Sequence, residues 1–235
     1  MANKPSKRYR KALEAVDAEA FYALESAVET IGKFPKTKFN ETVEAAFNLG
    51  VDPRKSDQMV RGTVPLPHGS GQEVVVLVFA KPGAAADAAK EAGADHVGFE
   101  DMLEKVKGGW TGFDVAVATP EAMSEVRKLG KVLGPRGLMP NPKTGTVTDN
   151  TAEAVNAVKA GRVEFKVDKT GNLHVPVGKA DFDANKLVEN TRAVIDAVMK
   201  AKPSSVKGRY VRSLSLSATM SPAVHVDLKE TQAAA

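Results

Sequence analysis

The chain has 235 residues, a length that predicts two compact domains, and its net charge of +4 suits a polyanionic partner without identifying one. It contains no cysteine, which excludes disulfides and thiolate metal sites, and its four histidines are scattered, so we expect no metal and no other cofactor. The longest apolar run, residues 74–80, is too short to cross a bilayer, and no hydrophobic signal stretch follows the basic N-terminus. We therefore expect a cytoplasmic protein with no membrane partner.

The first part of the chain predicts two helices. Residues 6–16 form a basic helical pattern, and Asp17 is placed to cap a second helix. The apolar side chains expected on the buried stripe of that second helix are Phe21, Leu24, Val28 and Ile31. The N-terminal cations could hold a phosphate backbone or form an ordinary solvated face, and the sequence leaves both open. These cations, with Tyr9 among them, are Lys4, Lys7, Arg8, Arg10 and Lys11.

A strand is predicted from Phe39 to Leu49, because the hydrophobic period there changes from helical to two. The side chains expected to face the core are Phe39, Val43, Ala45, Phe47 and Leu49. Glu41 interrupts this alternation, whereas polar residues occupy most of the opposite positions. The pattern is typical of a strand with one buried face.

A second kind of pattern begins after residues 63–71, which are dense in proline and glycine and therefore predict a crossing between domains. Residues 74–79 are continuously apolar, as in a strand of a parallel sheet that is covered on both faces. An alanine-rich helix that ends near Gly93 follows this strand. Together they predict a βα unit.

The βα pattern then repeats. Residues 113–118 predict another buried strand, and Thr119-Pro120-Glu121 supplies a cap, a proline and an acid suited to a helix start. A short strand at 146–148 and a helix at 151–160, closed by Gly161, complete the segment. The middle of the chain is thus predicted to form a small α/β domain.

The last part of the chain returns to alternating patterns. Residues 162–167 and 173–177 flank a turn-rich loop and predict a β-hairpin. A helix at 184–201 and a strand at 209–220 follow, and we expect the tail after Leu228 to be disordered.

The strand at 209–220 carries a row of hydroxyl side chains at every second position. They are Ser213, Ser215, Ser217 and Thr219. Such a row can donate to phosphate oxygens and exchange hydrogen bonds with the ribose 2′-hydroxyl, which distinguishes RNA from DNA. Serine and threonine are also common on any solvated sheet face, and composition alone favours that simpler interpretation.

Charge divides the chain into flanks and middle. Residues 1–67 and 160–235 together carry 23 bases and 17 acids, a net charge of +6, whereas residues 68–159 carry 10 bases and 12 acids. If the two flanks form one domain, the α/β segment at 68–159 is an insertion within it. The positive field then belongs to the discontinuous domain, where RNA is expected to bind.

A glycine- and proline-rich loop at 128–146 displays three cations, Lys131, Arg136 and Lys143. The rival interpretation is a nucleotide- or metabolite-binding enzyme centred on the α/β domain. A dinucleotide fold needs its glycine-rich turn directly after the first strand, and the loop at 128–146 lies much later and matches no phosphate-binding spacing. The paired acids at 41 and 44 and at 181 and 183 have ordinary structural explanations, so we expect no catalytic residue.

Several motifs, in this chain's order over nearly its whole length, closely resemble the "L one" family of bacterial large-subunit ribosomal proteins. The residues that carry the resemblance are Lys38–Glu44 (KFNETVE), Asp52–Gln58 (DPRKSDQ), Pro67–Gly69 (PHG), Lys131–Pro142 (KVLGPRGLMPNP) and Thr219–Met220. One position departs from the family, which usually has glycine after Thr-Met where this chain has Ser221.

The resemblance implies an α/β protein, an α+β split domain with an inserted Rossmann-like α/β domain, that is not an enzyme. It implies that the ribosome and large-subunit rRNA are partners, and that the chain forms the mobile lateral stalk. It also implies a part in release of deacylated exit-site tRNA and repression of translation by binding the chain's own operon mRNA.

The resemblance also assigns rRNA- and mRNA-binding residues. On the first strand they are Lys38, Phe39, Thr42 and Glu44; on the expected hairpin Lys166, Lys169, Thr170 and His174; on the last strand Ser213, Ser215, Ser217, Thr219 and Met220. The loop cations Lys131, Arg136 and Lys143 are candidates for a tRNA or second RNA contact, although a rigid structural loop is an equally good explanation.

Overall fold

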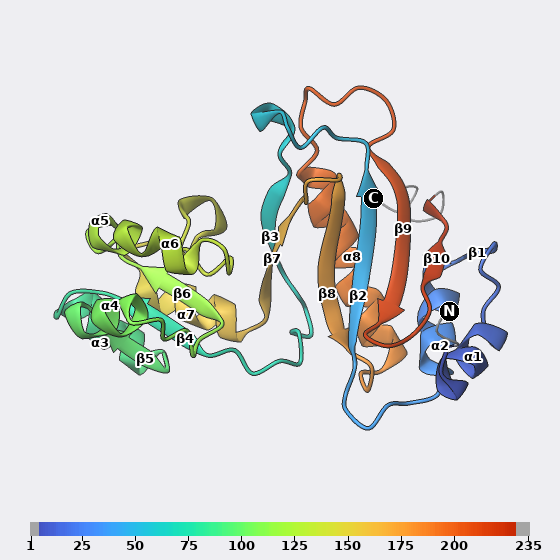
Figure 1. Cartoon of the computed structure of the whole chain (residues 1–235), viewed down its shortest axis with the longest axis horizontal. Coiled ribbons are helices and arrows are strands. Elements are labelled where there is room, and N and C mark those ends of the chain that lie inside the picture. The colour runs from blue at the N-terminus through green and yellow to red at the C-terminus, as the bar shows by residue number, and fades with distance from the viewer. Residues whose placement is uncertain (1–4, 229–235) are drawn as a thin grey trace. The chain divides into compact units, whose positions relative to one another are not determined.

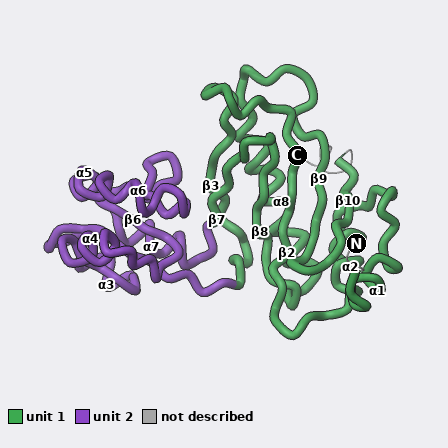
Figure 2. Tube along the Cα trace, viewed as in Figure 1, with its two compact units in different colours: residues 1–71, 163–235 green, residues 72–162 purple. Residues whose placement is uncertain are grey.

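The computed structural model describes residues 5–228, and the contacts among its residues divide the chain into two compact units (Figures 1 and 2). Unit 1 comprises residues 1–71 and 163–235, and unit 2 comprises residues 72–162. The sequence predicted divisions after residues 67 and 159, and the contacts place them after residues 71 and 162. Lys4 and the tail predicted after Leu228 lie outside the described residues.

Unit 1 contains a five-stranded sheet in the order β1-β10-β9-β2-β8, in which β1 runs parallel to β10 and the other neighbours are antiparallel. A separate two-stranded sheet pairs β3 with β7. The elements are α1 (Lys7–Glu14), β1 (Phe21–Tyr22), α2 (Leu24–Gly32), β2 (Thr42–Leu49), η1 (Ser56–Gln58), β3 (Arg61–Pro65), β7 (Arg162–Lys166), β8 (Asn172–Lys179), α8 (Ala184–Lys200), β9 (Val211–Ala218) and β10 (Val224–Val226).

One face of the five-stranded sheet forms the core of unit 1. Along β2 every second residue is buried, and on β9 the buried Leu214 and Leu216 alternate with half-buried serines. Helices α2 and α8 pack against this buried face, and α8 buries the stripe that its sequence period predicted, from Leu187 to Val198. The opposite face, which we call the outer face, carries no helix among the described residues (Figure 1).

The expected positions of two phenylalanines are wrong. Phe39 is 54% exposed and precedes β2, because the chain bends before the strand begins and the alternation does not extend back to it. Phe21 is exposed in β1 opposite His225, so helix α2 begins only at Leu24, and Asp17 does not cap it. Pairing of residues 21–22 with β10 takes this segment out of the predicted helix.

The predicted hairpin between residues 162–167 and 173–177 is also wrong. Strand β7 pairs with β3, and β8 pairs with β2 across the five-stranded sheet. The buried Phe165 packs over Gly62 of β3, where an added Cβ would lie 2.7 Å from the ring. This close approach favours pairing with β3, which also occupies part of the proline- and glycine-rich segment expected to be only a crossing.

Unit 2 is a small α/β fold around a parallel sheet in the order β5-β4-β6. Its elements are β4 (Val76–Phe79), α3 (Ala84–Glu91), β5 (His96–Gly98), α4 (Glu100–Lys107), β6 (Val115–Ala118), α5 (Met123–Val126), η2 (Arg127–Leu129), α6 (Gly130–Leu133), η3 (Pro142–Thr144) and α7 (Thr151–Lys159). Two apolar clusters flank the fully buried strand β4, so helices cover both faces of the sheet. The predicted α/β class is confirmed, whereas β5 and α4 had no counterpart in the sequence prediction.

Two further predictions in unit 2 differ in detail. Residues 146–148 contribute one parallel bridge, Ala118 to Val147, instead of a strand. The hydroxyl of Thr119 accepts a hydrogen bond from the Ala122 amide at 3.3 Å, and α5 begins only at Met123. Among the described residues no helix is both long and apolar enough to span a membrane, and no cluster of three or more potential metal ligands occurs.

Candidate nucleic-acid interface

The outer face of the five-stranded sheet presents hydrogen-bonding side chains in register across neighbouring strands. Ser213, Ser215 and Ser217 of β9 lie opposite Asn48, Ala46 and Glu44 of β2. On the other side of β2, Asn48 pairs with Asn172 and Ala46 with His174 of β8. The strand period turns the leucines of β9 into the core and leaves its serines half-exposed on the outer face. Together with the side chains of β2 and β8, these serines form a surface three strands wide.

Some of these side chains already have partners on the outer face. Ser215 Oγ lies 2.9 Å from His225 Nδ1, and His174 Nδ1 lies 3.3 Å from Glu44 Oε1. The Ser213 and Ser217 hydroxyls have no hydrogen-bond partner within residues 5–228, so they are available to an incoming ligand. The face thus combines free hydroxyls with two imidazoles and an acid.

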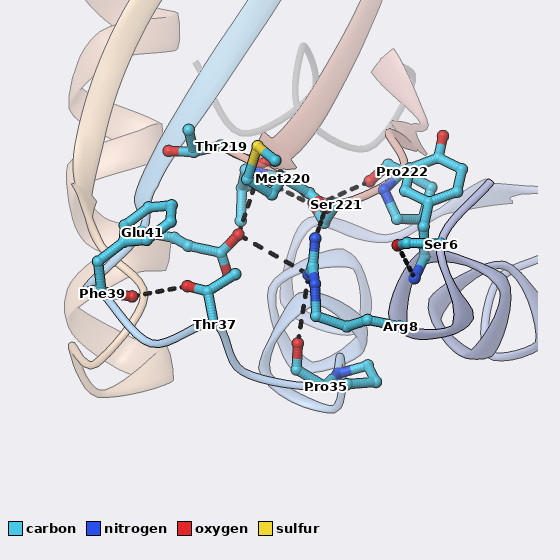
Figure 3. Close-up of polar contacts among 12 residues, drawn as sticks. Ser6, Arg8, Pro35, Thr37, Phe39, Glu41, Thr219, Met220, Ser221 and Pro222 are labelled. Carbon is cyan, nitrogen blue, oxygen red and sulfur yellow. Dashed lines mark hydrogen bonds and ion pairs between the residues drawn. The ribbon is translucent and has the colours of Figure 1, made fainter. Parts of the chain in front are cut away.

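Five of the candidate residues lie at or next to the start of β2 and the end of β9, and Figure 3 labels three of them, Phe39, Thr219 and Met220. The five are Lys38, Phe39, Thr42, Thr219 and Met220. The Thr219 hydroxyl accepts a hydrogen bond from the Thr42 amide at 3.1 Å, and the Thr219 amide donates to the Thr42 carbonyl at 3.1 Å. Two of the five, Phe39 and Met220, are large apolar residues that are nevertheless more than half exposed, at 54% and 53%.

Residues 218–221, which we call the Thr-Met turn, reverse the chain after β9. The Ser221 amide donates to the Ala218 carbonyl at 3.0 Å, and Ser221 Oγ accepts from the Ala218 amide at 2.8 Å. No non-glycine residue in the described part of the chain has a positive φ, so this turn does not need the glycine that the resemblance leads one to expect at 221. The serine side chain instead folds back and closes the turn.

Two charged side chains, those of Glu41 and Arg8, form hydrogen bonds with the backbone of Met220 in the Thr-Met turn. The Glu41 carboxylate, 6% exposed as a residue, accepts a hydrogen bond from the Met220 amide at 3.0 Å. Arg8 of α1 donates through Nη2 to the Met220 carbonyl at 2.5 Å and through Nη1 to the Pro35 carbonyl at 3.4 Å (Figure 3). Its Nη1 also lies 4.0 Å from Glu41 Oε1.

Of three more candidate residues, Lys169 and Thr170 lie in the loop at 168–171 that leads into β8, whereas Lys166 ends β7 of the separate two-stranded sheet. The Thr170 hydroxyl, helped by the Asn172 and Thr170 amides, lowers the pKa of Asp168 below its usual 3.8 against a smaller opposing effect of burial. Thr170 therefore serves the loop itself, while Lys166 and Lys169 are exposed. Since eight-residue strands span roughly 23 Å, the two ends of the face suit a folded RNA better than a single nucleotide.

The segment at 128–146, which was predicted to be a loop, contains short helical elements: Lys131 lies in α6, Lys143 lies in η3, and Arg136 lies between them. Lys131, Arg136 and Lys143 are exposed, and an Arg136 guanidinium nitrogen donates to the Thr111 hydroxyl. The buried Thr144 and Thr146 side chains both contact the Asn141 carbonyl, at 3.1 and 3.2 Å. This order fits a structural loop and equally fits a rigid display of three positive charges.

A cavity at the carboxyl end of β4 and β5 is where an enzyme of this fold would bind a nucleotide. Its charged lining residues are Lys81, Asp87, Lys90, Glu100 and Asp101. Three acids against two lysines oppose a phosphate group, and the backbone there lacks a glycine-rich phosphate loop. The cavity therefore does not favour the enzyme interpretation.

The sequence prediction missed several residues of the outer face. Strand period placed Asn48 on the polar side of β2, but neither Asn48 nor Asn172, whose Oδ1 accepts from Asn48 Nδ2 at 2.8 Å, was chosen as a contact. Lys179, whose Nζ donates to Thr42 Oγ1 at 2.9 Å, and His225 required knowledge of which strands are neighbours. Glu41 was recognised only as an exception to the alternation, although its odd position places it on the buried side with Val43.

Comparison with known proteins gives consistent matches. Residues 31–222 match the model of the "Ribosomal protein L1p/L10e family". The chain is 53% identical over 232 residues to the large ribosomal subunit protein uL1 of Protochlamydia amoebophila, covering 99% of this chain and 98% of that protein. It is 56% identical to the proteins of the same name from Persephonella marina, over 96% of this chain and 94% of that one, and from Beutenbergia cavernae, over 97% and 95%.

Proposed function

The chain belongs to the ribosomal protein L1p/L10e family and is a structural constituent of the large ribosomal subunit, and from this premise we propose that it binds large-subunit rRNA directly through unit 1. The family is one of ribosomal proteins, not of enzymes. The contact surface that we propose is the outer face of the five-stranded sheet together with the Thr-Met turn. Unit 2 is then the insertion within an rRNA-binding domain that both flanks of the chain build.

The observation that carries this proposal is the register of polar side chains across β9, β2 and β8. Free serine hydroxyls on a helix-free face can meet phosphate and ribose oxygens at several points along a folded RNA. The proposed contact residues are Lys38, Phe39, Thr42, Glu44, Lys166, Lys169, Thr170, His174, Ser213, Ser215, Ser217, Thr219 and Met220. The distribution of charge also favours unit 1 as the RNA-binding unit, since bases outnumber acids by five in unit 1, whereas acids outnumber bases by one in unit 2.

Footprinting on purified large-subunit rRNA, followed by binding to the protected fragment at several salt concentrations, tests the proposal. If Lys38, Lys166 and Lys169 each neutralise one phosphate, the slope of log affinity against log salt is about −2 to −3. Affinity then falls roughly 20- to 40-fold between 50 and 200 mM salt. A flat salt response, or protection of the RNA by unit 2 alone, would contradict binding through this surface.

We also propose three finer roles that the resemblance implies. The chain forms the mobile lateral stalk, takes part in release of deacylated tRNA from the exit site, and represses translation by binding its own operon mRNA. Repression by the same surface requires the mRNA site to fold like the rRNA site. The two RNAs must then compete, and simultaneous binding of both to one chain would contradict a shared surface.

Lys131 of α6, Arg136 and Lys143 of η3 are the proposed tRNA or second RNA contact, because all three are exposed on one glycine- and proline-rich segment of unit 2. Replacing all three with alanine should weaken deacylated tRNA binding to ribosomes that carry the variant and leave rRNA affinity unchanged. Lys105→Ala with Lys107→Ala, two exposed cations of α4, is the control. Equal tRNA binding by the loop variant and the control would leave the loop with a structural role alone.

A further inference from the structure

The backbone amide and carbonyl of Met220 each form a hydrogen bond with a charged side chain. Its amide donates to the Glu41 carboxylate at 3.0 Å, and its carbonyl accepts from the Arg8 guanidinium at 2.5 Å. Glu41 and Arg8 are far from Met220 in sequence, by 179 and 212 positions. A hydrogen bond to a charged group is stronger than one between neutral groups, so this pair of contacts fixes the turn more firmly than sheet bonds alone.

Arg8 differs in its surroundings from the other cations of α1. Its side chain is 25% exposed and reaches the connection at Pro35, the residue Glu41 and the Thr-Met turn, whereas Arg10 and Lys11 are exposed. No polar side-chain contact joins Arg10 to another residue of the described chain. The N-terminal helix thus contains at least one cation whose hydrogen-bonding capacity is already engaged by the protein.

We propose that Arg8 and Glu41 are positioning residues for RNA recognition, which clamp the backbone of Met220 so that Thr219 and Met220 are presented to RNA in one fixed geometry. Arg8 is then not a phosphate ligand, and Glu41 increases RNA affinity although it is an acid in a surface that binds a polyanion. This inference rests on the proposed rRNA-binding function and adds the residues that make its surface competent.

The physical argument is one of preorganisation. If only a fraction of molecules holds the turn in the binding geometry, the apparent affinity falls by that fraction. Without Arg8, the Met220 carbonyl loses this donor and the buried Glu41 carboxylate loses its nearest described cation. The turn then samples other conformations, and RNA binding must first select the competent one.

Removal of Glu41 distinguishes a positioning role from a purely electrostatic role, because the two roles predict opposite changes in RNA affinity. Deleting an acid beside a bound polyanion should strengthen binding if charge alone mattered. Positioning predicts the reverse, roughly a tenfold loss of affinity for the mapped rRNA fragment in Glu41→Ala and a smaller loss in Glu41→Gln, which keeps one acceptor for Met220. Asp181→Asn, an exposed acid lining the same shallow pocket as Glu41, is the matched control and should not weaken binding.

Salt dependence separates positioning from phosphate contact for Arg8. Arg8→Ala should lower affinity roughly tenfold with an unchanged salt slope, whereas loss of a phosphate ligand would reduce the magnitude of the slope by about 0.7 to 0.9. Arg8→Lys keeps the charge but not the planar fork that reaches a carbonyl and a carboxylate together, so it should lose nearly as much. A reduced slope in Arg8→Ala, or wild-type affinity in Arg8→Lys, overturns the proposal.

Hydrogen exchange of the Met220 amide in the RNA-free protein tests the clamp without any ligand. Exchange should accelerate about tenfold in Arg8→Ala and Glu41→Ala and stay unchanged in Arg10→Ala. Thermal unfolding of each variant identifies any that fails to fold, in which case Arg8→Lys and Glu41→Gln decide. Failure of the wild-type chain to bind rRNA would refute the proposed function, whereas wild-type exchange and affinity in folded clamp variants would refute this inference alone.

Discussion

Replacement of Phe39 with alanine should separate RNA affinity from stability. The Phe39 side chain is 54% exposed and belongs to none of the apolar clusters of the described chain, so its removal should change the free energy of unfolding by less than about 0.5 kcal/mol. An aromatic ring that stacks on an RNA base contributes about 1–3 kcal/mol. The expected loss of rRNA affinity is therefore roughly 5- to 150-fold.

Filter binding to the footprinted rRNA fragment, with urea denaturation of the same preparations, measures both quantities. Phe39→Leu keeps apolar area but no aromatic face and should fall between wild type and Phe39→Ala. Met59→Ala, a 49% exposed side chain in the segment leading to β3, controls for loss of exposed apolar surface and should bind normally. Unchanged affinity in Phe39→Ala, or a stability loss of about 3 kcal/mol as expected of a buried phenylalanine, would refute the reasoning.

Three further predictions concern stability and are measured by urea or thermal unfolding. Leu216→Ala, at a fully buried position of β9, should destabilise the chain by about 2–5 kcal/mol, and a loss below about 1 kcal/mol would contradict its place in the core. Asn190→Ala should lower the free energy of unfolding by about 2–4 kcal/mol, because the buried amide forms hydrogen bonds with three backbone groups. These are the His68 amide at 3.1 Å, the Gly69 carbonyl at 3.0 Å and the Val177 carbonyl at 2.8 Å. A near-neutral result would show that water replaces the amide. The pKa of Asp168 is lowered in the folded chain, so the stability that its carboxylate contributes is present above pH 3.8 and is lost as the pH falls through the folded pKa. The difference in free energy of unfolding between wild type and Asp168→Asn should therefore shrink on acidification. A difference that stays constant with pH would contradict this.

Local periodicity predicted those elements whose burial follows from their own sequence. Strand β2 buries Val43, Ala45, Phe47 and Leu49 as the alternation predicted, because one face of a sheet that packs on helices must be apolar. The helix at 184–200 and the alternation of β9 were predicted for the same reason. Strand β5 escaped prediction, since its three residues carry too little periodic signal. Helix α4 was also missed, although its eight residues bury Met102 and Val106 at helical spacing.

The candidate interface was predictable only in part. The row of serines on β9 follows from strand period, and the resemblance to a known family supplied the residues at 38–44 and 166–174. The engagement of Arg8 and Glu41 with Met220 joins residues about 180 to 210 positions apart, and no local pattern encodes such a contact. The same limitation applies to His225, which reaches the outer face only because β10 lies beside β9.

The pattern of residues along the chain predicted which segments alternate, which are helical, where charge accumulates and, through its motifs, the family. Three features could be established only from the folded chain: β7 pairs with β3 instead of β8, Phe39 is exposed, and Glu41 is buried against the Thr-Met turn. The physical reason is that hydrophobic period depends on neighbours within a few residues. Strand partners and buried charges, in contrast, depend on groups that meet only when distant segments fold together.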